Sequence, residues 1–208
     1  MDSDFLLRRT AFWSLCANVL FIVGMTGYLL VDLLDYVHLK PASLSITNSI
    51  YVLLASVFVI NATLHLCMML HTDKDVKGYR TMLVACAFDQ LGSYVYLLGA
   101  VLTATISTST NTIWTLNAVG VCAFVIAATM NITVSGTSHT SLWADNLNLL
   151  GSLFYLLAIV VTRMPLSQII VIFGDILYLI CSILYMMCWC DERESMRMMS
   201  DEQYLLFR

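Results

Sequence analysis

Charge is scarce in this sequence. Only 12% of the 208 residues are charged, whereas 60% are hydrophobic, and the mean hydropathy is +0.83. Soluble domains are about a quarter charged and about half apolar, so this composition favours lipid as the solvent. The net charge of −4, together with the lack of any long basic cluster, argues against nucleic acid as a partner. We expect a lipid bilayer to surround the chain.

Proline and glycine are also scarce, and the short loops that would face outward contain no cysteine. With two prolines and nine glycines, the chain has no low-complexity linker, which favours one compact membrane domain. Cys188 and Cys190 end the last apolar run, at the usual position of palmitoylation sites. The other five cysteines fall inside apolar runs, where a thiol behaves as a small hydrophobe. No disulfide framework is therefore expected.

Six long apolar stretches determine the predicted fold. A helix needs ~20 mostly apolar residues to cross ~30 Å of hydrocarbon. The qualifying stretches are 11–34, 47–70, 82–104, 113–135, 144–162 and 167–190. They predict an all-α, six-helix transmembrane bundle, preceded by residues 1–10 and followed by a tail at 191–208. The first stretch is too long for a signal peptide, so we expect it to be retained.

Lysine and arginine predict the orientation. Only Lys40 and Arg163 fall in the loops that would lie outside if the N-terminus is inside. The inner segments then carry Arg8, Arg9, Lys74, Lys77, Arg80, Arg193, Arg197 and Arg208. This bias follows the positive-inside rule and predicts that both termini are cytoplasmic. The outer loops, about 35–46, 105–112 and 163–166, are too short for a large outer domain.

A short motif recurs in the apolar stretches, with a small residue four positions before an aromatic one. The pairs are Gly24 and Tyr28, Gly92 and Tyr96, Gly151 and Tyr155, Gly120 and Phe124, Gly174 and Tyr178, and, most weakly, Thr47 and Tyr51. Residues four apart share a helix face. The small residue lets a neighbouring backbone approach, and the ring fills the adjacent gap. We interpret the motif as helix packing in a bundle built from three repeated hairpins.

Polar residues inside the stretches are the candidates for a cavity or an ion pathway. They are Asp89, Asp175, Asn117, Asn148, Asn18, Asn61 and His65. Amides commonly cross-link membrane helices, for about 0.6–2 kcal/mol each. A charged aspartate at the bilayer centre costs about 2.5–3.5 kcal/mol, and no Lys or Arg lies deep in any stretch. Asp89 and Asp175 are therefore the strongest candidates.

No cofactor or metal site is expected. His65 and His71 occupy one stretch, and no other stretch offers a histidine for a haem or a metal. Phe88-Asp89 and Ile172-Phe-Gly-Asp175 resemble the YD and GxGD motifs of presenilin-type intramembrane proteases, which implies an acid and a carboxylate that activate water. That family has a glycine at the position of Ile172. It also has a proline after the second aspartate, in a PAL motif, whereas Pro165 precedes that aspartate here. Six spans are too few for the family.

Both ends carry motifs that are similar to eukaryotic adaptor-binding signals. The tail has a DxxxLL and a YxxΦ match, which comprise Asp201, Tyr204, Leu205, Leu206 and Phe207. A second dileucine match includes Leu6 and Leu7. They predict a plasma-membrane, endolysosomal or vacuolar location. The alternative is an amphipathic tail that packs on the bundle.

Two functions stay open. One is a small ion or proton channel or transporter, or a membrane subunit of one, with Asp89 and Asp175 facing an internal cavity. The other is a non-catalytic scaffold that packs against partner helices, as a homo-oligomer or with another membrane protein. The first requires a hydrated cavity among the polar side chains, whereas the second requires tight packing.

Overall fold

The computed structural model describes residues 3–37, 44–105, 109–134, 138–161 and 163–206, and the side chains of 3–9, 44 and 195–206 are not described. Its helices are α1 (Ser3–Tyr36), α2 (Leu44–His71), α3 (Tyr79–Thr105), α4 (Thr110–Val134), α5 (His139–Val160) and α6 (Leu166–Leu206). All six are long and apolar enough to cross a membrane. Within these ranges there is no strand. The predicted all-α fold with six spans is confirmed, and such helices imply a lipid bilayer environment.

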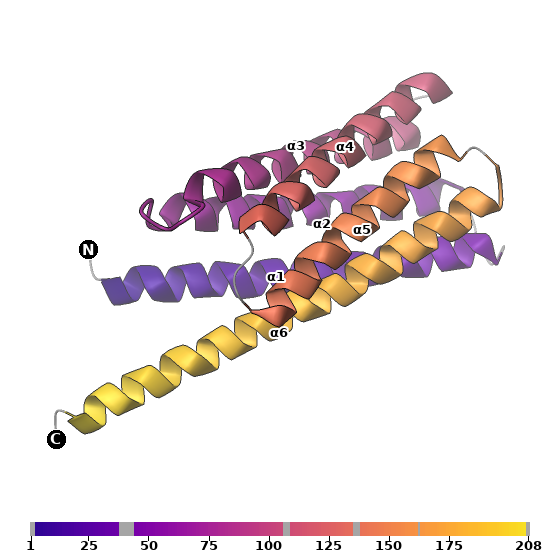
Figure 1. The fold of residues 1–208 in the computed structure, drawn as a ribbon. Helices are drawn as coiled ribbons and strands as arrows, with labels where there is room; N and C mark the ends of the chain where they lie inside the picture. The colour runs from indigo at the N-terminus through magenta and orange to yellow at the C-terminus, as the bar shows by residue number, and fades with distance from the viewer. Residues whose placement is uncertain (1–2, 38–43, 106–108, 135–137, 162, 207–208) are drawn as a thin grey trace.

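The helices form a closed ring. Each helix packs against its neighbours in sequence, and α1 also packs against α6. Among the described residues, no other pair of helices brings its backbones this close, although Tyr28 of α1 reaches Tyr96 of α3 across the ring. Successive helices run in opposite directions, so the two termini lie at the same end of the bundle (Figure 1). We call this the terminal end, and the other the opposite end.

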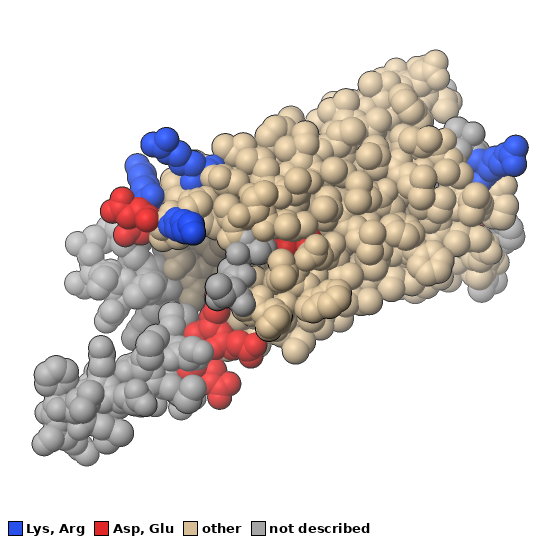
Figure 2. All heavy atoms as spheres, in the orientation of Figure 1, with Lys and Arg blue, Asp and Glu red and all other residues tan. Residues whose placement is uncertain are grey.

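Charged and apolar side chains are segregated on the surface. Lys74, Lys77 and Arg80 lie in or beside the α2–α3 loop at the terminal end, whereas Arg163 lies in the α5–α6 loop at the opposite end. Figure 2 shows Lys and Arg at the two ends and none on the visible flank between them. Large apolar side chains are exposed along the spans, such as Leu53 at 64%. This surface fits a bilayer between two polar ends.

Glycines set the close approach of helices within two of the hairpins. In the α3–α4 hairpin, a methyl group added at Gly92 would lie 2.8 Å from the ring of Phe124 and 3.0 Å from the backbone oxygen of Gly120. In the α5–α6 hairpin, one added at Gly151 would lie 3.0 Å from Tyr178. These distances are shorter than van der Waals contact. Each glycine therefore fits where a larger residue would force the helices apart.

The α1–α2 hairpin has a related contact with one difference. A methyl group added at Gly24 would lie 2.9 Å from the ring of Phe58, so Phe58 supplies the ring of α2. In the sequence motif, the aromatic residue of this helix is Tyr51, which is paired with Thr47. Tyr51 lies two turns away and instead donates a hydrogen bond to Asp32 of α1. Packing across the hairpin, which one helix alone does not encode, decides which ring meets the glycine.

We predict that Gly92→Leu destabilises the bundle by about 1–3 kcal/mol, as expected for overpacking. The reason is that Gly92 faces a backbone oxygen of the partner helix, which cannot move aside as a side-chain end can. The measurement is the thermal unfolding midpoint in detergent. Ala87→Leu is the matched control, because Ala87 lies exposed on the same helix. Equal midpoints for the two variants would contradict the close α3–α4 contact.

Candidate functional site

A cavity of about 430 Å³ lies inside the helix ring and is lined by residues of all six helices. It extends from the terminal end, where Ser14, Met69 and the exposed Glu192 contribute to its wall, to the middle of the bundle. None of its lining residues lies more than about one turn beyond Tyr28 or Phe58 toward the opposite end. The cavity is thus a vestibule that reaches about half of the way through the bundle.

Six aromatic rings, one from each helix, form the inner end of the cavity. We call them the aromatic layer: Tyr28, Phe58, Tyr96, Phe124, Tyr155 and Tyr178. The ring centroid of Tyr28 is 5.6 Å from that of Phe58 and 6.2 Å from that of Tyr96. Tyr155 and Tyr178 are 5.7 Å apart. Such spacings are those of packed aromatic pairs, and the cavity ends at the depth of these rings.

The glycine contacts determine the depth of this layer. Gly24, Gly92 and Gly151 each lie against a ring of the aromatic layer from the partner helix of their hairpin. Gly174 lies in the same way against Tyr155, where a methyl group would be 2.9 Å from the ring. The rings therefore meet at one depth because the packing of each hairpin directs them there.

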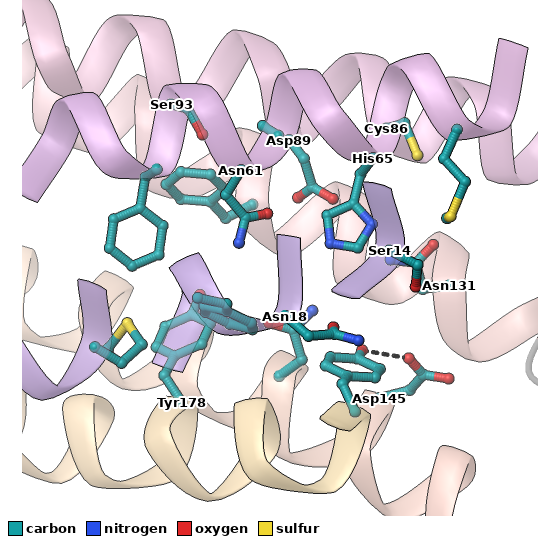
Figure 3. A pocket seen from close by; sticks show the side chains of 18 of the residues that line it. Ser14, Asn18, Asn61, His65, Cys86, Asp89, Ser93, Asn131, Asp145 and Tyr178 are labelled. Carbon is teal, nitrogen blue, oxygen red and sulfur yellow. Dashed lines mark hydrogen bonds between the residues drawn. The ribbon is translucent and has the colours of Figure 1, made fainter. Parts of the chain in front are cut away.

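The polar candidates divide into two groups. Asp89, Asn148, Asn18, Asn61 and His65 line the cavity, whereas Asp175 and Asn117 do not. Figure 3 shows Asp89 and His65 pointing into the cavity from α3 and α2. Asn117 instead lies against Gly99 on the far side of the aromatic layer, where a methyl group added at Gly99 would be 3.2 Å from its oxygen.

Asp89 is the carboxyl group best placed to meet a ligand. No other described residue makes a hydrogen bond with its side chain, and it is partly exposed to the cavity. Asn61 is already bonded, through its amide nitrogen, to the backbone oxygen of Ala17 at 3.0 Å. Asp145 accepts a hydrogen bond of 2.5 Å from Tyr185 (Figure 3). No Lys or Arg of the described chain lines the cavity.

A second cluster lies just beyond the aromatic layer. Asp175 of α6 is 0% exposed, and its Oδ1 accepts a hydrogen bond from Tyr155 of α5. Asp32 of α1, one turn past Tyr28, accepts one from Tyr51 of α2. Asp32 and Asp175 are close enough for each to affect the ionisation of the other. We call these two residues the carboxyl pair.

The partner of Asp175 is therefore Asp32 and not Asp89. The aromatic layer separates Asp89, on the cavity side, from Asp175 on the other side. The protease resemblance required Asp89 and Asp175 to act on one water molecule, and the structure does not bring them together. A fully buried Asp175 also leaves no room for a peptide bond beside it.

Sequence reasoning missed Asp32 and Asp145. Each falls at an end of its expected span, where a carboxyl group is easily read as exposed to water. One signal was present, because Asp32 follows Tyr28 by four positions and Asp145 precedes Asn148 by three. Both spacings place the aspartate on the face that carries the packing motif or the cavity polarity.

Other candidates carry less information. Among the described residues, no group of three or more His, Cys, Asp or Glu side chains could hold a metal ion. Of the sorting motif, Asp201, Tyr204, Leu205 and Leu206 lie on the last turns of α6, where side chains are not described, and Phe207 lies outside the described residues. The sorting motif therefore stays a prediction.

We predict that Cys86 is reached from the cavity by a small water-soluble thiol reagent. Cys86 lines the cavity, whereas Cys181 is 0% exposed, and buried thiols are inert. The measurement compares labelling rates of two variants that retain only one of these cysteines, in detergent and in proteoliposomes. Cys86 should be labelled and Cys181 should not. Labelling of Cys86 as slow as that of Cys181 would mean that the cavity does not admit water.

Comparison with known proteins gives no assignment. No family model matches the sequence, no curated protein matches it, and no solved structure matches the fold. The cavity, the aromatic layer and the carboxyl pair are therefore the features that bear on function.

Proposed function

We propose that the protein is a membrane carrier for a small organic cation. The observation that carries this proposal is a cavity of about 430 Å³ that is accessible at one end of the bundle and closed at the other by the aromatic layer. Carriers bind substrate near the bilayer midplane and expose the site to one side at a time. A channel would need a continuous path, which the aromatic layer interrupts.

The size of the cavity favours an organic solute over a bare ion. Sites for small molecules occupy about 300–1,000 Å³, and this cavity falls within that range. A single water molecule takes up only about 30 Å³ of liquid volume. A dehydrated inorganic ion would therefore leave most of the space unfilled.

The lining favours a positive charge on that solute. Asp89 offers a carboxyl group without a competing partner, and the aromatic layer offers ring faces. Aromatic rings attract ammonium groups, by about 2 kcal/mol or more where water is excluded. With no Lys or Arg of the described residues in the lining, an anion would find no matching charge. A protonated or quaternary amine fits this chemistry.

The scaffold alternative is less well supported. A scaffold needs interhelical packing but no internal space, and polar side chains in it should be bonded to one another. Asp89 instead faces the cavity without a partner among the described residues. A large vestibule that contains unpaired polar groups would lower the stability of a scaffold without serving its function, because each enclosed polar group must be hydrated or paired.

We infer that the cavity opens to the cytoplasm, since Lys and Arg are concentrated at the terminal end. The test uses single-cysteine variants Lys77→Cys and Thr110→Cys, two exposed positions at opposite ends. A membrane-impermeant maleimide added to intact cells should label Thr110→Cys and should label Lys77→Cys only after permeabilisation. The reverse pattern would invert the orientation.

We predict that Asp89→Asn lowers amine uptake about tenfold or more, since a charge-assisted contact is worth about 1.5–3 kcal/mol. The amide has nearly the volume of the carboxyl group, so the fold should persist. The measurement is uptake of radiolabelled tetramethylammonium and of small primary amines into proteoliposomes. Asp75→Asn is the control, because Asp75 is exposed in the α2–α3 loop. Uptake by Asp89→Asn equal to that of the control would contradict the role of Asp89.

A further inference from the structure

Helices α2 and α3 present two levels of polar side chains to the cavity. Asn61 and His65 lie four residues apart on α2, so they occupy one face of that helix about one turn apart. Asp89 and Ser93 have the same spacing on α3, which packs against α2. All four residues line the cavity, and Figure 3 shows their side chains pointing into it.

The two levels lie at different distances from the aromatic layer. Asn61 and Ser93 are each three residues from the aromatic-layer ring of their own helix. His65 and Asp89 are each seven residues from the same rings. At about 1.5 Å per residue, these offsets are about 4.5 Å and about 10.5 Å along the helix axes. We call Asn61 and Ser93 the inner level, and His65 and Asp89 the outer level.

The hydroxyl group of Ser93 is available to a ligand. Ser93 is only 3% exposed, and no described residue makes a hydrogen bond with its side chain. Several other hydroxyl groups of the spans donate to the backbone oxygen four residues earlier, as Ser56 does to Val52 at 2.8 Å. Ser152, three residues from the aromatic-layer ring of α5, is bonded to Tyr178 at 2.6 Å. Ser93 is thus a buried polar group at the inner end of the cavity that lacks such a bond.

Asn61 supplies an acceptor at the same level. Its amide nitrogen donates to the backbone oxygen of Ala17 at 3.0 Å, which fixes the orientation of the amide group. Its amide oxygen accepts no hydrogen bond from the described residues. A hydroxyl group of a ligand could donate to this oxygen and accept a hydrogen bond from Ser93, because a hydroxyl group has both capacities. A carbonyl or carboxylate group could not donate.

The two levels also differ in charge. The acids that line the cavity are Asp89, Asp145 and Glu192, and the last two lie farther from the aromatic layer than Asp89 does. The lining of the inner level therefore contains no carboxyl group. A positive charge on the ligand would find a partner at the outer level only, because a charge that is removed from water needs an opposite charge beside it. The inner level instead suits a neutral polar group.

We propose that the substrate is an amino alcohol, whose positively charged nitrogen binds at Asp89 and whose hydroxyl group binds between Ser93 and Asn61, next to the aromatic layer. Ser93 is then a specificity-determining residue, which selects hydroxylated amines over amines with an alkyl end. A short carbon chain between the two groups matches the spacing of about one helical turn, or ~6 Å, between Asp89 and Ser93. This inference rests on the proposed carrier function and names the substrate class of the same cavity.

The test measures how two competitors inhibit the uptake of radiolabelled tetramethylammonium into proteoliposomes. One competitor is (3-hydroxypropyl)trimethylammonium. The other is butyltrimethylammonium, in which a methyl group replaces the hydroxyl group. The two compounds have the same charge and nearly the same size, so the ratio of their half-inhibitory concentrations reports on the hydroxyl group. In the wild type, the hydroxylated compound should inhibit at the lower concentration.

Three variants separate the two levels. Ser93→Ala should reduce the preference for the hydroxylated compound about threefold to tenfold, as expected for the loss of one hydrogen bond. Ser56→Ala is the matched control and should keep both uptake and preference, because the hydroxyl group of Ser56 is bonded to its own helix and does not line the cavity. Asp89→Asn should weaken both competitors by the same factor and keep the preference, because both carry the same charge.

Each failure has a distinct meaning. Equal inhibition by the two compounds in the wild type would overturn the hydroxyl site and leave the carrier in place. An unchanged preference in Ser93→Ala would overturn the role of Ser93. If the wild type takes up no tetramethylammonium, the carrier is overturned, and the substrate class with it. If Ser93→Ala does not fold, Ser93→Cys retains nearly the same volume with a weaker donor and should also reduce the preference. An unchanged preference in that variant would equally exclude Ser93.

Discussion

The close contact of glycine with an aromatic ring inside each hairpin is the interaction on which the site depends. Because Gly24, Gly92 and Gly151 leave no room for a side chain, the ring of the partner helix lies against the backbone at a fixed depth. Six helices closed into a ring then bring six aromatic side chains together, four of which lie against a glycine in this way. The result is one aromatic layer, which ends the cavity on one side and encloses the carboxyl pair on the other. The depth of the cavity is defined by this layer.

Among the described residues no lysine or arginine lines the cavity, and this determines how the buried acids are held. Tyrosine hydroxyls serve as donors in three places, to Asp32, to Asp145 and to Asp175. A neutral donor satisfies a carboxyl oxygen without compensating its charge, which a buried lysine or arginine would do. Each acid therefore keeps its ability to bind a proton or a cation. In a membrane, where a fixed ion pair would make an acid inert, this is the arrangement that a transport function requires.

The sequence predicted the fold well and the site in part, for a physical reason. Length and apolarity are properties of one segment at a time, so six helices could be read directly, although α6 continues to Leu206 and not to 190. The place of a polar side chain depends on neighbours. Asp175 is buried but does not line the cavity, and it lies near Asp32 of α1, because ring closure by α1 and α6 is not encoded in any local pattern. Asp32, read as the end of a span, was overlooked for the same reason.

The α1–α6 contact, which closes the ring, is bonded by different groups at its two ends. Toward the opposite end, Gln168 donates to Asp35 at 3.1 Å. At the terminal end the same two helices are joined by Trp189, which donates to the backbone oxygen of Ala11 at 3.3 Å. Asp32 and Asp175 lie in the opposite half of the bundle, so negative charge on both acids would cause repulsion there and not in the terminal half. The α1–α6 contact is therefore more sensitive to charge where the bundle is closed than where the cavity opens.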